Sequence, residues 1–258
     1  MLYFKFFKIH LKKLKEYRFS MFLSIFSQML TCAVSLLTIY FLFDRFKIVD
    51  GWTFEQVAIS YAVVQFCFSI IECFFRGIDE FPSLVKSGTL DSFLVRPRSI
   101  FSQALCHQVE FSKIGKTIVS LIILIYACLI QPFTFTPLKI LVLISMVLCG
   151  IIIFLSLFML AGAFSIFTID GIETMNIFTY GGKEFCQYPI NIYGKTFTKI
   201  FTFIIPFATF NYLPMMYLFN MPNTSIINII SPFIGMLFFI PCYLIFKWSL
   251  KRYMSTGS

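Results

Sequence analysis

The sequence predicts an all-α integral membrane protein with six transmembrane helices, and three observations lead to that prediction. Of its 258 residues, 59% are hydrophobic and only 13% are charged, and the mean hydropathy is +0.86. Soluble domains carry about twice that charged fraction, so a soluble fold could not cover this much apolar surface. The apolar residues gather into runs near the ~20-residue length that crosses a bilayer. The basic residues cluster at the ends of those runs.

The first 18 residues predict a basic amphipathic helix that lies on a membrane surface and contacts lipid. An apolar stripe and a neighbouring lysine stripe both follow helical spacing. A plain positive flank that only orients the first span is the alternative. No small-residue cleavage site follows, so we expect the next apolar run to be retained as a span. The apolar stripe comprises Phe4, Phe7, Leu11 and Leu14, and the lysine stripe includes Lys12.

Five spans follow directly from the apolar runs, and the charges between them predict the orientation. Cytoplasmic segments of membrane proteins carry an excess of Lys and Arg. Fifteen of these residues fall in 1–18, 76–116 and the C-terminal tail, against five in the opposite loops. We therefore expect a multi-pass protein of the cell membrane with both termini and the long 76–110 loop in the cytoplasm, and the composition is typical of a bacterial source. The expected spans are 19–43, 56–75, 111–130, 138–169 and 226–246.

Residues 170–225 can be threaded through the membrane in two ways, because prolines interrupt them. In one threading, 200–218 is the fifth span, and hydropathy alone favours this choice. In the other, the more polar 171–188 is the fifth span, and 189–222 dips into the outer leaflet and returns. Broken backbone at membrane depth is tolerated only where protein or a water-filled cavity satisfies it. Both threadings give six spans in total.

Several classes of site are excluded by the motifs. Residues 115–117 (Gly-Lys-Thr) match the end of a P-loop, but Glu110 stands where that motif needs its first glycine. The eight cysteines form no CxxC pair and the two histidines lie far apart, so we predict neither a disulfide framework nor a metal site. The basic residues do not form one face with interleaved aromatics, which argues against nucleic acid. We therefore expect no enzymatic activity and no cofactor bound by this chain.

A short helix is predicted at residues 89–96, within the 76–110 loop. Gly88 breaks the chain, Thr89 is a good N-cap, and Asp91 falls in the first turn, where the helix dipole favours an anion. Arg96 falls in the last turn, and Pro97 stops the helix.

One face of this predicted helix is apolar, because Leu90, Phe93 and Leu94 follow i, i+3, i+4 spacing. Such an element suits docking into a groove on a soluble partner. A connector helix without a partner is the alternative.

Ionisable residues in or near the spans have two interpretations, a transport pathway or a structural ion pair. For Glu72 and Glu110 we favour ion pairing or placement among the lipid headgroups. For Lys183 and Glu184, which are adjacent in the chain, we favour a role in a pathway or a subunit interface.

Three segments resemble type-2 ABC exporter permeases. The stretch SGTLDSFLVRP (87–97) resembles the G-x-L-D-x-x-L-x-R-P segment that follows the second span in that family. EFCQYPINIY (184–193) and IIPFATFNYLP (204–214) resemble signatures of the branch that includes the viologen exporters. The resemblance covers nearly the whole chain, in length and in the six-span arrangement.

This resemblance implies an interface helix near 2–17, a coupling helix at 89–96, and a re-entrant hairpin at 189–222, which favours the second threading. It implies an exporter subunit that works with an ABC ATPase dimer, which binds ATP and Mg²⁺, and with a second permease, for which a paralogue is favoured over a second copy of this chain. A stand-alone secondary transporter or channel is the alternative, although the two halves show no repeat. Candidate pathway or gate residues are Lys183, Glu184, Tyr188, Pro189, Pro206, Tyr212 and Pro214.

Overall fold

The computed structural model describes residues 18–130, 136–168, 172–222 and 224–254. Within these residues the only sheet is a strand pair, β1 (Ile48–Val49) with β2 (Trp52–Thr53), and the rest of the regular structure is helical. Five helical segments are long and apolar enough to cross a membrane, and one bent pair makes a sixth if it is counted as a single span. The protein is therefore an all-α integral membrane protein, as the sequence predicts.

The five long segments occupy the ranges in which spans are expected. The first continues past residue 43 to Phe46, because the charged Asp44 and Arg45 can lie at the membrane surface without ending the helix. The fifth consists of two helices joined at Leu237. The segments are α2 (Arg18–Phe46), α3 (Phe54–Phe74), η1 (Phe111–Lys113) with α8 (Ile114–Ile130), α9 (Pro137–Ser165), and α15 (Ile226–Met236) with α16 (Phe239–Leu250).

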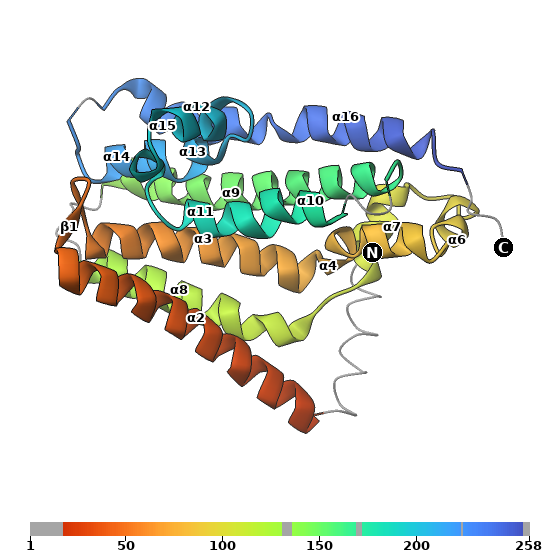
Figure 1. Ribbon diagram of the computed structural model, residues 1–258, viewed down its shortest axis with the longest axis horizontal. Helices are drawn as coiled ribbons and strands as arrows, with labels where there is room; N and C mark the ends of the chain where they lie inside the picture. Colours follow the sequence, from red (N-terminus) through yellow and green to blue (C-terminus); the bar gives the residue numbers. More distant parts are fainter. Residues whose placement is uncertain (1–17, 131–135, 169–171, 223, 255–258) are drawn as a thin grey trace.

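Short elements gather at the two ends of the bundle (Figure 1). We call the end that holds α4–α7 the loop end, and the end that holds β1, β2 and α12–α14 the hairpin end. Both Arg18 and the end of α16 lie toward the loop end. The loop end holds α4 (Arg76–Asp79), α5 (Phe81–Lys86), α6 (Asp91–Leu94) and α7 (Ile100–His107), and the hairpin end holds η4 (Ile190–Tyr193), α12 (Lys195–Phe203), α13 (Phe207–Phe210) and α14 (Tyr212–Leu218). Three further short elements run between the two ends: α10 (Ile172–Asn176), η3 (Ile177–Gly181) and α11 (Gly182–Cys186).

The α10–η3–α11 run lies beside α3 and α9 (Figure 1). Beyond it, the chain turns sharply at the hairpin end, where α12 and the α13–α14 pair meet at 82°. Pro206 precedes α13 at this bend, and a proline cannot donate the backbone hydrogen bond that would continue α12. Asn211 fixes the bent segment, because its Nδ2 donates to Ser60 Oγ at 2.6 Å and to the Cys186 carbonyl at 2.7 Å.

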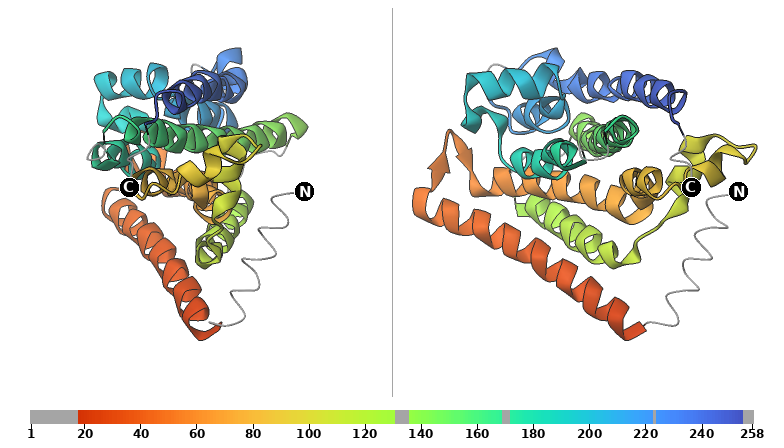
Figure 2. Two further views of the ribbon diagram at one scale, coloured as in Figure 1. Left: turned by 90° about the vertical axis from the view of Figure 1, so that its right-hand side faces the viewer. Right: turned by 45° about the vertical axis from the view of Figure 1, so that its right-hand side comes forward.

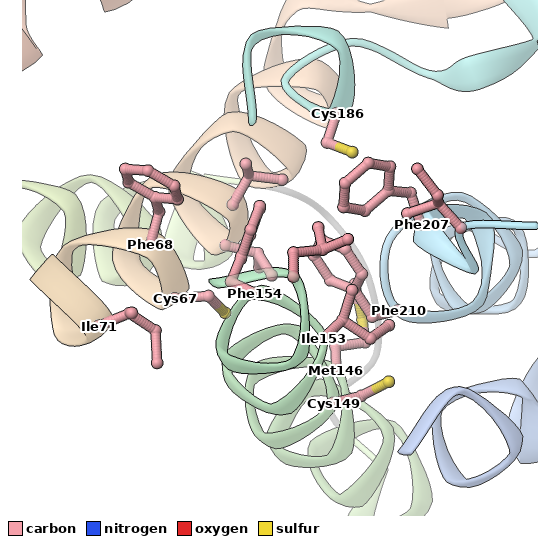
Figure 3. Close-up of a cluster of buried hydrophobic side chains, with 14 of the residues drawn as sticks. Cys67, Phe68, Ile71, Met146, Cys149, Ile153, Phe154, Cys186, Phe207 and Phe210 are labelled. Atoms are coloured by element: carbon pink, nitrogen blue, oxygen red, sulfur yellow. The ribbon is translucent and has the colours of Figure 1, made fainter. Parts of the chain in front are cut away.

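The core lies where α3, α9 and α13 meet (Figure 3). The ring of Phe154 lies 5.1 Å from that of Phe68 and 5.8 Å from those of Phe207 and Phe210, measured between centroids. Gly150 allows this approach, because a Cβ at that position would lie 2.9 Å from the Phe210 ring. All eight cysteines are buried as free thiols, packed like small apolar side chains.

The span α2 is the least covered by the rest of the chain. Its buried residues are Cys32, Ile39 and Phe43, and Figure 2 shows its Arg18 end standing away from the other helices. Its approach to α8 depends on Gly115, where an added Cβ would lie 2.4 Å from the Ile25 carbonyl oxygen. Small residues permit such backbone contact between membrane helices.

Replacing Gly115 with alanine is expected to destabilise the protein by about 1–3 kcal/mol, because α2 and α8 must separate to admit the methyl group. Thermal unfolding of the purified protein measures the effect. Gly181→Ala is the matched control, since a Cβ there meets nothing closer than 3.8 Å. Equal unfolding temperatures for the two variants would contradict the role of Gly115.

Candidate functional site

The predicted helix in the long loop is shorter than expected. It is α6, which comprises Asp91–Leu94, and its N-cap is Leu90, without a side-chain cap bond. Thr89 does not cap it; its hydroxyl lies 2.7 Å from that of Ser87. Arg96 lies beyond the helix end. The predictions of a helix over 89–96, of a Thr89 cap and of Arg96 in the last turn are therefore wrong.

A tight turn accounts for the difference. Gly88 adopts a φ of +69°, a conformation that glycine takes without steric cost. The turn brings the Leu90 amide to the Leu84 carbonyl at 3.2 Å, so Leu90 is bound to the preceding helix instead of beginning α6. Because α6 ends at Leu94, Pro97 lies in the exposed loop beyond it and does not end the helix.

The apolar face predicted for this helix is divided between buried and exposed side chains. Leu90 is fully buried and Phe93 is 4% exposed, so both pack into the protein. Leu94 points outward with 47% exposure and is joined by Val95, at 84%. On α7, Gln103 donates to the Phe93 carbonyl at 3.0 Å and holds α6 in place. The apolar surface that stays exposed here is therefore Leu94 and Val95.

Arg76 on α4 is the centre of a charge network at the loop end. Its guanidinium pairs with Asp79, with Glu80 Oε1 at 2.8 Å and with Glu110 Oε2 at 3.1 Å. It also donates to the Tyr180 hydroxyl at 3.0 Å, and that hydroxyl donates to Asp79 Oδ2 at 2.8 Å. Burial raises the pKa of Asp79, and the Arg76 charge opposes that rise. The network links the 76–110 loop to η3, a segment that is distant from it in sequence.

A second charge cluster lies next to the first, inside the helix bundle. Glu72 is buried on α3, and its carboxylate lies 3.3 Å from the ammonium groups of both Lys113 and Lys116. Glu72 and Glu110 thus form the ion pairs that the sequence favours for them.

Lys183 and Glu184 both lie on α11, and Glu184 borders a groove between α11 and α2. Their side chains pair at 2.8 Å, with Lys183 mostly buried and 5.2 Å from the Phe68 ring centroid. The Glu184 side chain is 63% exposed and faces a pocket of about 410 Å³. On the α2 side, this pocket is lined by Ser35 and Thr38.

Tyr188 extends the groove toward the hairpin end. It lines the same pocket and, together with Tyr193, a second one of about 530 Å³ that reaches Asp50 in the β1–β2 turn. The Asn191 side chain donates to Asp50 and joins this turn to η4. The two pockets form one groove, polar beside Glu184 and more apolar near Asp50, which we call the α2–α11 groove.

The other candidate pathway residues lie in the bent segment. Pro189 precedes η4, and Pro206 precedes α13. Tyr212 begins α14 with its ring 6.1 Å from that of Trp52, and Pro214 is buried in α14. The structure therefore brings Lys183, Glu184 and Tyr188 together but leaves the later residues on the hairpin. The interface-helix residues Phe4, Phe7, Leu11, Lys12 and Leu14 lie outside the described residues.

Sequence reasoning missed the α2 side of the groove and the role of Arg76. A signal for the former exists, because hydroxyl residues recur at helical spacing along α2, at Ser27, Thr31, Ser35 and Thr38. The hydroxyls of Thr31, Ser35 and Thr38 donate to carbonyls of the same helix, as Thr31 does to Ser27 at 2.9 Å. Asp79 and Glu80 follow Arg76 at i+3 and i+4, the spacing of helix ion pairs, but no short-range signal marks Glu110 or Tyr180 as its partners.

Comparison with known proteins covers most of the chain. The model of a family described as ABC-2 family transporter protein matches residues 29–257. No curated protein and no solved structure matches the chain. The matched range includes the loop end, the α2–α11 groove and the hairpin end.

Proposed function

Because the chain belongs to the ABC-2 family of transporter proteins, we propose that it is the membrane-spanning permease subunit of an ATP-driven exporter. Hydrolysis takes place on a separate ATPase dimer, which binds ATP and Mg²⁺. This chain passes the resulting motion to its spans. The family match over residues 29–257 carries the proposal.

In the proposed arrangement the loop end faces the cytoplasm and the hairpin end faces the opposite side. The α10–η3–α11 run is the fifth of six spans, and the η4–α14 segment re-enters the membrane from the far side. Two features support this arrangement: the run lies beside α3 and α9, and the following helices bend by 82°. The excess of Lys and Arg in segments near the loop end supports the orientation.

Coupling to the ATPase runs through α6 and α4. Leu94 and Val95 present exposed apolar surface, and covering such surface with a partner removes it from water, which stabilises the complex. Motion of α6 reaches α7 through Gln103, and α7 packs on α4. From α4 the Arg76 network leads to η3.

The transport pathway forms between this chain and a second permease, along the α2–α11 groove. Supporting features are the exposed Glu184 carboxylate, the hydroxyls of Ser35 and Thr38, and the poor coverage of α2 by the rest of the chain. A polar groove at membrane depth requires water or a protein partner to satisfy it.

Purification from its own cells in mild detergent, followed by mass spectrometry, tests the proposal. A stoichiometric ATPase with a P-loop, with or without a second six-span protein, is expected. Recovery of the chain alone, from a complex shown to be intact by crosslinking in cells, would instead indicate a stand-alone secondary transporter or channel.

Replacing Leu94 and Val95 with serine is expected to lower the recovered ATPase by about tenfold or more, because burying two such side chains against a partner contributes more than the ~1.4 kcal/mol that a tenfold change in affinity requires. Quantitative mass spectrometry against the permease provides the measurement. Phe203→Ser with Ile204→Ser is the control, an equally exposed apolar pair at the hairpin end. Unchanged recovery from the first variant, or an equal loss from both, contradicts docking at α6.

A further inference from the structure

A pocket of about 290 Å³ lies between the start of α7 and the second half of α16, at the loop end. It has no part in the pathway or in the ATPase contact proposed above. Lys247 of α16 and Lys251, the C-cap of that helix, line it one helical turn apart. Both are exposed, and within the described part of the chain neither forms an ion pair with a carboxylate.

Positive potential in this pocket also comes from α7. Ser99, the N-cap of that helix, lies in the lining, and its hydroxyl accepts from the Ser102 amide at 3.3 Å. The first-turn amides of a helix carry partial positive charge. Both lysines and this helix end therefore border one space, and no Asp or Glu lines it.

An apolar wall borders the charged part. Phe101 of α7 lies 5.6 Å from the Tyr243 ring and 6.3 Å from the Phe246 ring, between centroids. Next to Lys247, the exposed Trp248 is covered by the Arg252 guanidinium at 4.3 Å. Tryptophan and basic residues in this combination are typical of the headgroup level of a bilayer.

We propose that this pocket binds an anionic glycerophospholipid, with the headgroup phosphate between Lys247 and Lys251 and the acyl chains along Phe101 and Tyr243. Basic pockets at the ends of transmembrane helices recognise such headgroups. The lipid contacts α7, the same helix whose Gln103 holds α6 in place. A lipid bound in the pocket therefore stabilises the packing of α7 and α6 at the loop end. The inference does not depend on the proposed exporter function.

Native mass spectrometry of the full-length protein, delipidated in detergent and titrated with phosphatidylglycerol, tests the site. Lys247→Gln with Lys251→Gln is expected to raise the lipid concentration for half-occupancy about 10- to 30-fold, since each lysine near a headgroup contributes substantially. Lys247→Arg with Lys251→Arg is expected to retain wild-type binding and shows that loss in the glutamine variant does not reflect misfolding.

A control variant and two further ligands test whether binding reflects general surface charge or a simple anion site instead of this pocket. Lys195→Gln with Lys199→Gln removes an exposed pair of the same spacing on α12 and is expected to leave binding unchanged. Phosphatidylcholine and inorganic phosphate are expected neither to occupy the pocket nor to compete with phosphatidylglycerol. Equal loss from the two glutamine pairs, unchanged binding in Lys247→Gln with Lys251→Gln, or displacement by inorganic phosphate overturns the proposal.

Discussion

Replacing Glu72 with glutamine is expected to destabilise the protein by about 3–5 kcal/mol, because removing one partner of a buried ion pair leaves uncompensated charge. The Glu72 side chain is only 3% exposed and is the shared carboxylate for Lys113 and Lys116. Without it, two ammonium groups face each other at the junction of α3 with the η1–α8 segment. Charges at membrane depth are costly unless they are paired.

Thermal unfolding in detergent measures this loss, and a second substitution identifies its cause. Lys116→Met in the Glu72→Gln background is expected to recover part of the stability, because it removes the more deeply placed unpaired charge. Glu55→Gln, at the other end of α3, is the matched control and should change stability by less than about 1 kcal/mol. If the double variant is no more stable than Glu72→Gln, charge imbalance is not the cause.

Replacing Arg76 with methionine is expected to have a comparable effect, about 3–5 kcal/mol, because three carboxylates then share a partly buried space without a cation. Asp79, Glu80 and Glu110 all depend on this guanidinium. Tyr180 also loses a hydrogen bond, so only its bond to Asp79 still joins η3 to α4 in this network. In the proposed exporter, this variant uncouples ATP hydrolysis from transport.

The pH dependence of the Arg76→Met deficit provides a specific test. Burial raises the pKa of Asp79 even in the presence of Arg76, and removing Arg76 raises it further. On acidification Asp79 is therefore protonated earlier in the folded protein than in the unfolded chain. The wild type then loses an attraction and the variant loses a repulsion, so the deficit in stability should shrink as the pH is lowered from neutral.

Two substitutions control for the change of side chain. Arg76→Lys keeps the charge and is expected to recover most of the stability, although it cannot reproduce the forked contacts of the guanidinium. Arg98→Met removes an exposed arginine from the same loop and should have little effect. A pH-independent deficit for Arg76→Met would point to lost packing and not to lost charge.

Local sequence patterns predict where the long helices lie, but they do not predict which segments pack against a given helix face. The apolar runs predict where the long helices lie, because a bilayer requires continuous hydrogen-bonded segments of a set length. The same reasoning places Leu90 and Phe93 on an apolar helix face. It could not show that this face packs inward, because α7 comes back to cover it from later in the chain.

The sequence alone determined the fold class, the location of the long spans and the position of a short helix in the 76–110 loop. These depend on composition and on neighbours within a few residues. Tertiary structure alone decided the contacts of Arg76 with Glu110 and Tyr180, the pairing of Glu72 with two lysines and the α2–α11 groove. Each depends on side chains from distant segments, as the Arg76–Tyr180 contact illustrates. Contacts between distant segments depend on how the helices pack, and the spacing of neighbouring residues does not encode that packing.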